Sequence, residues 1–383
     1  MTERYELIGP LGTGGMAEVL LARRVGLNGF ERLLAVKRIR PERAQDPDLV
    51  RMLLDEARNA ASLVHQRIVQ VFDIGMRDGV VELAMEYLHG RTLEDVLARE
   101  PRVPLAAAIA IAVAVADGLQ HAHTRASPIV HRDVAPSNVM ITYDGSVKLI
   151  DFGIAKAANN LSNTVFGTFK GRLGYSSPEQ CRCEPTDARS DIYSLAVLLY
   201  EMTTGARAYT AATEQDLLAV MTEARIARPT SIDPAFPPAL EAIIMKGLAP
   251  DRSQRYETAH EMQQDLEAFA RAGALNLSEG SLSRLMNDLF ASDLVTWIRD
   301  RDTGVTLEDH VLQQVARSTI AHHGAPPPAR NTVDVDRETT MLPPRPRRTS
   351  RRKASASPAL RIALVVALIA VAYVVTRLVL TAP

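Results

Sequence analysis

The sequence contains little cysteine. Only Cys181 and Cys183 occur, one residue apart, in a chain of 383 residues. Two thiols cannot build a disulfide framework, nor can they supply the four ligands of an all-cysteine zinc site, so a reducing compartment is expected. The first ten residues, MTERYELIGP, also lack the apolar core of a signal peptide, and we therefore expect this end of the chain to stay in the cytoplasm.

Most of the chain also lacks an excess of positive charge. Residues 1–344 carry 36 Lys and Arg against 45 Asp and Glu, a formal charge of −9. Binding to a nucleic-acid backbone needs concentrated positive surface, so nucleic acid is not an expected partner. Residues 345–383 differ, because they hold eight basic residues and no acidic one. This basic end requires a separate explanation.

The order of patterns along the chain predicts several segments. Up to about residue 272, strand-like runs such as Val80–Met85 alternate with helical stretches such as Leu105–Thr124, which predicts one α+β body. Residues 273–323 follow as a helical extension, in which apolar residues at helical spacing indicate packing against a core or a partner. In residues 324–358, seven prolines and many arginines leave too little apolar material to fold, which predicts a flexible linker.

Residues 360–380 are predicted to form a transmembrane helix. Ile362–Thr376 carries no charge, and the apolar run extends to Leu380 if Arg377 reaches toward a lipid headgroup. A buried core helix is the alternative, but behind a Pro/Arg-rich linker such a helix would have nothing to pack on. Because the basic residues precede this segment, the positive-inside bias predicts a single-pass protein of the cytoplasmic or inner cell membrane, with its folded body in the cytoplasm.

Two motifs near the N-terminus point to a phosphate ligand. Leu11–Val19 reads LGTGGMAEV between strand-like runs, which indicates a hairpin whose glycines let backbone N–H groups approach phosphates. A dinucleotide-binding fingerprint would need a helix immediately afterwards, whereas Val19–Val25 is predicted to be a strand. Lys37 then lies within an apolar strand, where an unpaired ammonium would be costly. Glu56, in the next helical stretch, is its candidate partner.

The motif that decides between these interpretations lies further along. His131–Asn138 reads HRDVAPSN, and after a short hairpin Ile150–Gly153 reads IDFG. Together with the Gly-rich loop and the strand lysine, in this order and spacing, these motifs match the protein-kinase signature set. From about residue 5 to 272 the chain therefore resembles the bacterial eukaryotic-type (Hanks-type) Ser/Thr protein kinases. The resemblance implies a two-lobed α+β fold, with a small β-rich N-lobe and a larger helical C-lobe.

The resemblance also implies ATP and Mg²⁺ or Mn²⁺ as cofactors, with a role for each matching residue. Asp133 would accept the proton of the substrate hydroxyl, and Lys37 would hold the α- and β-phosphates and pair with Glu56. Asn138 and Asp151 would hold the metal ions. The implied nucleotide-binding residues, which are otherwise ordinary apolar core and loop positions, are Leu11, Gly12, Gly14, Gly15, Val19, Ala35, Lys37, Glu86, Leu88 and Met140, with Met85 as gatekeeper and Ile150 beside the adenine.

Two positions depart from the family pattern. Ala135 stands where Ser/Thr kinases usually have a lysine that touches the γ-phosphate, and Arg172 stands where they usually have the threonine that contacts this lysine. We expect Arg172 to act as a catalytic residue in place of the missing lysine, because a forked guanidinium suits phosphate. Pro136 keeps the loop closer to the Ser/Thr pattern than to the tyrosine-kinase pattern.

The segment after the IDFG motif contains candidate phosphorylation sites. A kinase with an arginine before its catalytic aspartate, here Arg132, is commonly ordered by a phosphate on this segment. Thr168 is the first candidate and Thr164 the second, while ordinary polar loop residues are the alternative. The resemblance further implies two structural contacts in the C-lobe. Glu179 would pair with Arg255, and Asp191 would brace the catalytic loop.

The function implied is a membrane-tethered Ser/Thr protein kinase that transfers the ATP γ-phosphoryl group to proteins and autophosphorylates its activation loop, with a homodimer as a route to that step. The alternative is a pseudokinase scaffold that docks partners at the membrane, but Lys37, Asp133 and Asp151 are all present. Expected partners are ATP, protein substrates, the membrane through the C-terminal helix and its basic flank, and phosphothreonine-recognition domains that would bind phosphorylated Glu338-Thr339-Thr340.

Overall fold

The computed structural model describes most of the chain up to residue 322. The described residues are 5–13, 17–26, 31–39, 51, 54, 57–77, 79–152, 173–211, 213–293, 295–296 and 306–322. The chain divides into two units, residues 1–335 and 336–383, and every described residue belongs to the first. The linker predicted at 324–358 and the transmembrane helix predicted at 360–380 lie outside the described residues.

The N-lobe is built on an antiparallel sheet that, in the described part of the chain, has five strands in the order β1-β2-β3-β5-β4. These strands are β1 (Glu6–Thr13), β2 (Ala17–Val25), β3 (Glu31–Ile39), β4 (Val71–Arg77) and β5 (Val80–Glu86). Because successive side chains of a strand point to opposite faces, Leu34 and Val36 enter one small core while Ala35 and Lys37 face the other side. This alternation places the strand lysine on the face that meets the rest of the molecule.

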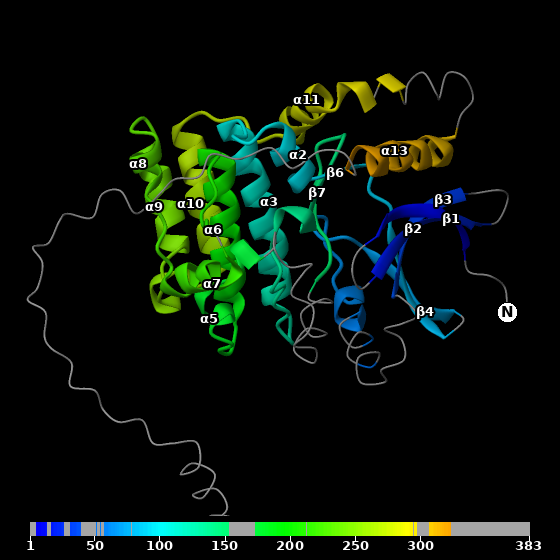
Figure 1. The fold of residues 1–383 in the computed structure, drawn as a ribbon, viewed down its shortest axis with the longest axis horizontal. Coiled ribbons are helices and arrows are strands. Elements are labelled where there is room, and N and C mark those ends of the chain that lie inside the picture. The colour runs from blue at the N-terminus through cyan, green and yellow to red at the C-terminus, as the bar shows by residue number, and fades with distance from the viewer. Residues whose placement is uncertain are drawn as a thin grey trace, which may run out of the picture. The chain divides into compact units, whose positions relative to one another are not determined.

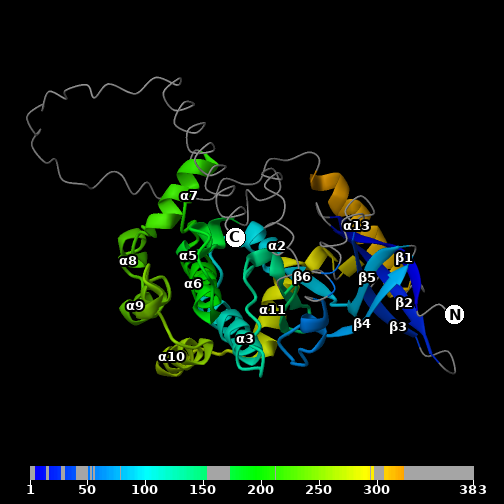
Figure 2. The same ribbon diagram turned by 90° about the horizontal axis from the view of Figure 1, so that it is seen from below.

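The C-lobe is helical, as Figures 1 and 2 show in colours from cyan (α2 and α3) through green to yellow-green (α10). Its helices are α2 (Leu93–Arg99), α3 (Leu105–His123), α5 (Pro178–Cys181), α6 (Ala188–Thr204), α7 (Glu214–Glu223), α8 (Pro229–Ile232), α9 (Pro238–Gly247) and α10 (Ala259–Ala272). At the centre, α6 is buried on every side from Ser190 to Thr203 and packs against α3 and α9. The expected α+β architecture with a β-rich N-lobe and a helical C-lobe is confirmed.

Helix α3 carries only apolar side chains from Leu105 to Ala116. Among the described residues it alone is long and apolar enough to cross a membrane, and 67% of its most apolar stretch is buried within the protein. It packs against α6 and α10, which bury its apolar side chains. Helix α3 is thus the core helix of the C-lobe.

A small sheet and a short helical turn lie where the lobes meet. The sheet has the order β6-β7-β8 and consists of β6 (Gly90–Thr92), β7 (Val139–Thr142) and β8 (Val147–Leu149). The turn η2 (Pro136–Asn138) directly precedes β7, and a parallel bridge joins Ile68 to Leu149. The predicted hairpin between the HRDVAPSN and IDFG motifs is therefore confirmed as β7 and β8.

The predicted helical extension contains α11 (Glu279–Leu289) and α13 (Leu307–His322). Helix α11 packs against α2, α3 and β7 of the C-lobe, and Leu282 and Met286 are buried there, which confirms the predicted packing role of its apolar residues. Helix α13 instead packs against β1 of the N-lobe, where it is drawn in orange beside the blue sheet (Figures 1 and 2). The extension therefore contacts both lobes.

Candidate active site

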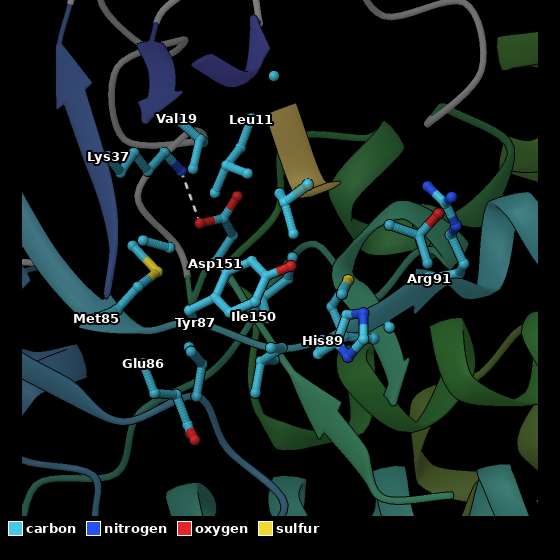
Figure 3. Close-up of a pocket in the computed structure, with 18 of the residues that line it drawn as sticks. Leu11, Val19, Lys37, Met85, Glu86, Tyr87, His89, Arg91, Ile150 and Asp151 are labelled. Atoms are coloured by element: carbon cyan, nitrogen blue, oxygen red, sulfur yellow. Dashed lines mark hydrogen bonds and ion pairs between the residues drawn. The ribbon is translucent and has the colours of Figure 1, made fainter. Parts of the chain in front are cut away.

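A cavity of about 310 Å³ opens between the N-lobe sheet and the segment that leads into the C-lobe (Figure 3). A volume of this size is within the range of small-molecule sites. The predicted nucleotide-binding residues that line it are Leu11, Gly12, Val19, Ala35, Lys37, Glu86, Leu88 and Met140, together with Met85 and Ile150. These residues come from β1, β2, β3, β7, the end of β5 with the segment after it, and the residue that follows β8, so folding brings distant parts of the sequence to one cavity.

An ion pair lies on the wall of this cavity. The Nζ of Lys37 donates to Oδ1 of Asp151 at 2.7 Å, and both side chains are largely buried (Figure 3). The two residues are 114 positions apart in the chain. Asp151 has a left-handed backbone with φ of 60°, an uncommon conformation for a residue with a side chain. Such conformations persist where the surroundings impose them, and they concentrate at functional sites.

Asp133 and Asn138 form a second pair on the loop before β7. The amide nitrogen of Asn138 donates to Oδ2 of Asp133 at 2.9 Å and to the Asp133 carbonyl at 2.8 Å. The carbonyl of Asn138 in turn accepts from the backbone N–H of Ile150, at 3.0 Å. Asn138 thus connects the HRDVAPSN loop with the residue that precedes Asp151.

The carboxylate of Asp191 holds the backbone of the HRDVAPSN loop. This carboxylate accepts from the backbone N–H groups of His131 and Arg132, each at 2.7 Å, and lies 2.8 Å from Nε2 of His123. Full burial would raise the pKa of Asp191, but the hydrogen bond and charge of His123 and the loop contacts outweigh burial and lower it. The anion is therefore stable in the core, and it holds Arg132 in a left-handed conformation with φ of 63°. The predicted bracing role of Asp191 is confirmed.

The donor atoms present fit a hard divalent cation. Asn138 is fully buried, and its Oδ1 has no hydrogen-bond partner among the described residues. A buried acceptor without a partner is costly, so a ligand there would satisfy it. The described residues contain no cluster of three His, Cys, Asp or Glu side chains. Asn138 and Asp151 offer an amide oxygen and a carboxylate, and such oxygen donors suit Mg²⁺, which typically binds through one or two protein ligands plus phosphate oxygens and water.

Some predicted site residues fall outside the described part of the chain. These are Glu56, Gly14, Gly15 and Arg172, and with them the activation-segment hydroxyls Thr164 and Thr168. Their predicted roles stay predictions.

The motifs, the bracing contacts and most of the residues that line the cavity lie within one stretch of the chain. Residues 5–266 match the family model described as the protein kinase domain, which covers well over half of the chain. The chain belongs to the protein kinase family.

Related kinases match mainly over the same region. The chain is 39% identical over 275 residues to the tyrosine-protein kinase MasK of Myxococcus xanthus, covering 69% of this chain and 43% of MasK. It is 38% identical over 326 residues to the serine/threonine-protein kinase PknB of Mycobacterium tuberculosis, covering 79% and 51%. The crystal structure of the M. tuberculosis PknI kinase domain superposes with a TM-score of 0.55 at 28% identity, covering 70% of this chain and 97% of that domain. The chain thus spans about half the length, or less, of these curated relatives.

The structure also confirms the predicted contact between Glu179 and Arg255 of this kinase. Arg255 donates to both carboxylate oxygens of Glu179, at 2.7 and 2.8 Å. Next to this pair, the side-chain amide of Gln180 donates to the carbonyl of Arg132 at 3.0 Å. The Ser-Pro-Glu segment is therefore joined both to the C-lobe core and to the loop that carries Asp133.

Several cavity residues were not found from the sequence. After Leu88 the chain continues along the cavity, and the additional lining residues from this stretch are His89, Gly90, Arg91, Thr92 and Asp95. Glu86, a predicted nucleotide-binding residue, lines the cavity, but its carboxylate points away from the cavity (Figure 3) and accepts from Lys148 and from the Gln70 N–H. The kinase motifs gave no signal for Val311 and Val315 of α13, which also line the cavity.

Proposed function

We propose that this protein is a Ser/Thr protein kinase that transfers the γ-phosphoryl group of ATP to protein hydroxyls and is tethered to a membrane by its C-terminal segment. The observation that carries the proposal is the Lys37–Asp151 ion pair at 2.7 Å on the wall of a cavity of about 310 Å³. An ammonium and a carboxylate at this place are the groups that phosphates and their metal ion require. The hydrogen-bonded Asp133 and Asn138 supply the remaining side chains for transfer.

Each residue has a definite task in this proposal. Lys37 binds the α- and β-phosphates, and Glu56 pairs with Lys37 in the active state. Asp133 orients the substrate hydroxyl and accepts its proton, while its hydrogen bond from Asn138 keeps the carboxylate in place. Asn138 and Asp151 hold Mg²⁺, which when bound neutralises charge on the phosphates. Catalysis then consists of positioning and electrostatic stabilisation.

Further proposed roles belong to the Gly-rich loop, to Arg172 and to the activation segment. Gly14 and Gly15 let backbone N–H groups of the Gly-rich loop approach the phosphates. Arg172 supplies the positive charge that a lysine at position 135 usually provides in Ser/Thr kinases. Autophosphorylation of Thr168 or Thr164 orders the activation segment, because the phosphate binds Arg132.

Serine and threonine are the proposed acceptors, although MasK carries the name of a tyrosine kinase. The catalytic loop contains Pro136 at the start of η2, and this position follows the Ser/Thr pattern. PknB, which aligns over a longer part of the chain, is named a serine/threonine kinase. The acceptor residue is therefore the first thing to measure.

The test is phosphate transfer by the full-length protein in detergent, with γ-labelled ATP, Mg²⁺ and a basic protein substrate. We expect label on the kinase and on the substrate, and phosphoserine and phosphothreonine after acid hydrolysis. No label should be incorporated when EDTA removes the metal before ATP is added. Phosphotyrosine as the sole product would contradict the proposed acceptor. ATP binding without any transfer would identify a pseudokinase scaffold instead.

The membrane tether rests on the uncharged run Ile362–Thr376 and the basic residues before it. We expect the full-length protein to remain in the membrane pellet after alkaline carbonate extraction. The full chain with Leu368→Lys and Val371→Lys should move to the supernatant, because each lysine at the centre of a span costs about 3 kcal/mol. Replacing Leu342 and Thr349 of the linker by lysine is the matched control and should leave the protein in the pellet. Extraction of the unaltered chain would contradict the tether.

A further inference from the structure

Helix α13 lies beyond the stretch that matches the protein kinase domain model, yet it packs on the N-lobe. The family match ends at residue 266, whereas α13 begins at Leu307. Its start is well defined, because Thr306 accepts from the Asp309 N–H at 3.2 Å and donates to the Asp309 carboxylate at 2.9 Å. A capped start of this kind stabilises a helix at its own N-terminus. Helix α13 is thus an additional element attached to the kinase fold.

One face of α13 makes the contacts with the N-lobe. Asp309 and Gln313 are exposed, whereas the other residues of α13 whose burial is described are buried or partly buried: Leu307, Glu308, His310, Val311, Leu312 and Val315. This is the pattern of a helix that buries one side and exposes the other. The packed side includes both residues that line the cavity.

Two contacts fix α13 against the strands that carry the Gly-rich loop. The side chain of Leu312 occupies the space beside Gly9 of β1, where a Cβ on the glycine would lie 2.6 Å from Cδ2 of Leu312. A side chain at position 9 would therefore displace Leu312. Glu308 also lies 3.6 Å from Arg23 of β2. Helix α13 is therefore held by the packing of Leu312 against Gly9 and by the ion pair between Glu308 and Arg23.

The packed face of α13 reaches the cavity itself. Val311 is only 5% exposed, and it lines the cavity together with Val315, Leu11 and Gly12. In Figure 3 the orange ribbon of α13 lies beside Leu11, opposite the labelled residues of the segment after β5. The two valines therefore add an apolar wall that the kinase motifs do not provide.

The part of the extension around α11 contacts Arg91, one of the residues that line the cavity. Arg91 lines the cavity, and its guanidinium donates to Asp293, just after α11, at 2.7 Å. Arg91 and Arg99 both lie over the ring of Phe290, which is fully buried. The extension thus contacts the cavity wall at Arg91 as well as at α13.

We propose that α13 is part of the nucleotide site, and that Val311 and Val315 contact the nucleoside of bound ATP. The proposal rests on the proposed kinase function. With α13 in place the cavity still measures about 310 Å³, so the helix forms a wall and leaves room for a ligand. Apolar side chains suit the flat faces of a base or the carbons of a ribose, whereas the phosphates belong beside Lys37. The segment after the kinase domain therefore sets the affinity for ATP.

The test is calorimetric titration of the full-length protein in detergent with Mg²⁺-ATP. We expect Val315→Asp, which puts a charge in the apolar wall, and Leu312→Asp, which releases the helix from Gly9, each to raise the Kd for ATP at least tenfold. Gln313→Asp introduces the same charge on the exposed side of the same helix turn and should change the Kd less than twofold. The thermal unfolding of each variant shows whether it is folded.

A milder variant separates the nucleoside contact from an effect of charge. Val315→Ala should weaken ATP and adenosine by the same factor, about threefold, because adenosine lacks the phosphates but keeps the proposed contact. It also supplies the measurement if the aspartate variants do not fold. Unchanged Kd values in Val315→Ala and Leu312→Asp would overturn the proposal, and tighter binding in Leu312→Asp would show that α13 obstructs the site. If the unaltered protein binds no ATP, the proposed kinase function itself fails.

Discussion

Replacing Asp133 by asparagine should lower phosphoryl transfer to a protein substrate by about two to four orders of magnitude. Asparagine has the same shape and keeps an oxygen for the hydrogen bond from Asn138, which is 2.9 Å in the kinase. It cannot accept the proton of the substrate hydroxyl. Because Asp133 is not among the residues that line the cavity, the Kd for ATP should stay within twofold. Single-turnover kinetics measures the rate of phosphoryl transfer, and calorimetric titration measures the Kd for ATP, so the two effects can be separated.

The same substitution at Asp288 is the matched control for this prediction. Asp288 is exposed on α11, and Asp288→Asn should leave both the rate and the ATP affinity unchanged. If Asp133→Asn retains more than a tenth of the activity, Asp133 does not act as the acceptor. If Asp133→Asn also loses ATP binding, its carboxylate has a structural role that the hydrogen bond from Asn138 does not explain.

Much of the fold and of the site was predictable because the signals are local. A lysine within an apolar strand and a glycine-rich turn before it are short patterns, and strand alternation then decides that Lys37 faces the cavity. The loop His131–Asn138 and the β7–β8 hairpin follow each other directly in the chain. The expected contacts of Asp191 and Glu179 came from the family resemblance, and both are present.

The parts that the sequence did not predict depend on contacts between distant elements. The contact of Lys37 with Asp151, 114 residues away, was not predicted. The predicted pairing of Lys37 with Glu56 stays a prediction, because Glu56 lies outside the described residues. The direction of the Glu86 side chain depends on Lys148, which belongs to another strand. The apolar stripe of α13 indicated packing, but no pattern in a helix states which surface it covers. Tertiary packing decides these contacts, so motif spacing alone could not find them.

Replacing Glu179 by glutamine should lower the free energy of unfolding by about 3 to 5 kcal/mol, because it leaves the buried guanidinium of Arg255 without its counter-charge. The Arg255 side chain is 0% exposed and that of Glu179 is 3% exposed. Arg255 also lies over the ring of Tyr193, and Ser190 donates to the carboxylate at 2.7 Å, so the charge cannot move to water. Urea unfolding followed by circular dichroism measures this loss.

The pH dependence of this loss provides a second test. Burial would raise the pKa of Glu179, but the hydrogen bonds from Arg255 and Ser190 outweigh it and lower the pKa from 4.5 to about 2. A carboxylate with a lowered pKa stabilises the fold above its unfolded-state pKa, and this stabilisation disappears as the pH falls through the folded-state value. The difference is worth roughly 3 kcal/mol. The gap in stability between the unaltered protein and Glu179→Gln should therefore be constant above about pH 5 and should narrow as the pH falls toward 2.

Two further variants distinguish a buried ion pair from an ordinary surface contact. Arg182 and Glu184 lie 3.8 Å apart nearby, with 38% and 48% of their side chains exposed, so Glu184→Gln should change the stability by less than about 0.5 kcal/mol. Glu179→Leu combined with Arg255→Met removes both charges at once and should be more stable than Glu179→Gln, since neither partner remains buried and unpaired. A loss below 1 kcal/mol in Glu179→Gln, or no recovery in the double variant, would mean that water or other groups compensate Arg255 and that this pair does not hold the Ser-Pro-Glu segment on the C-lobe.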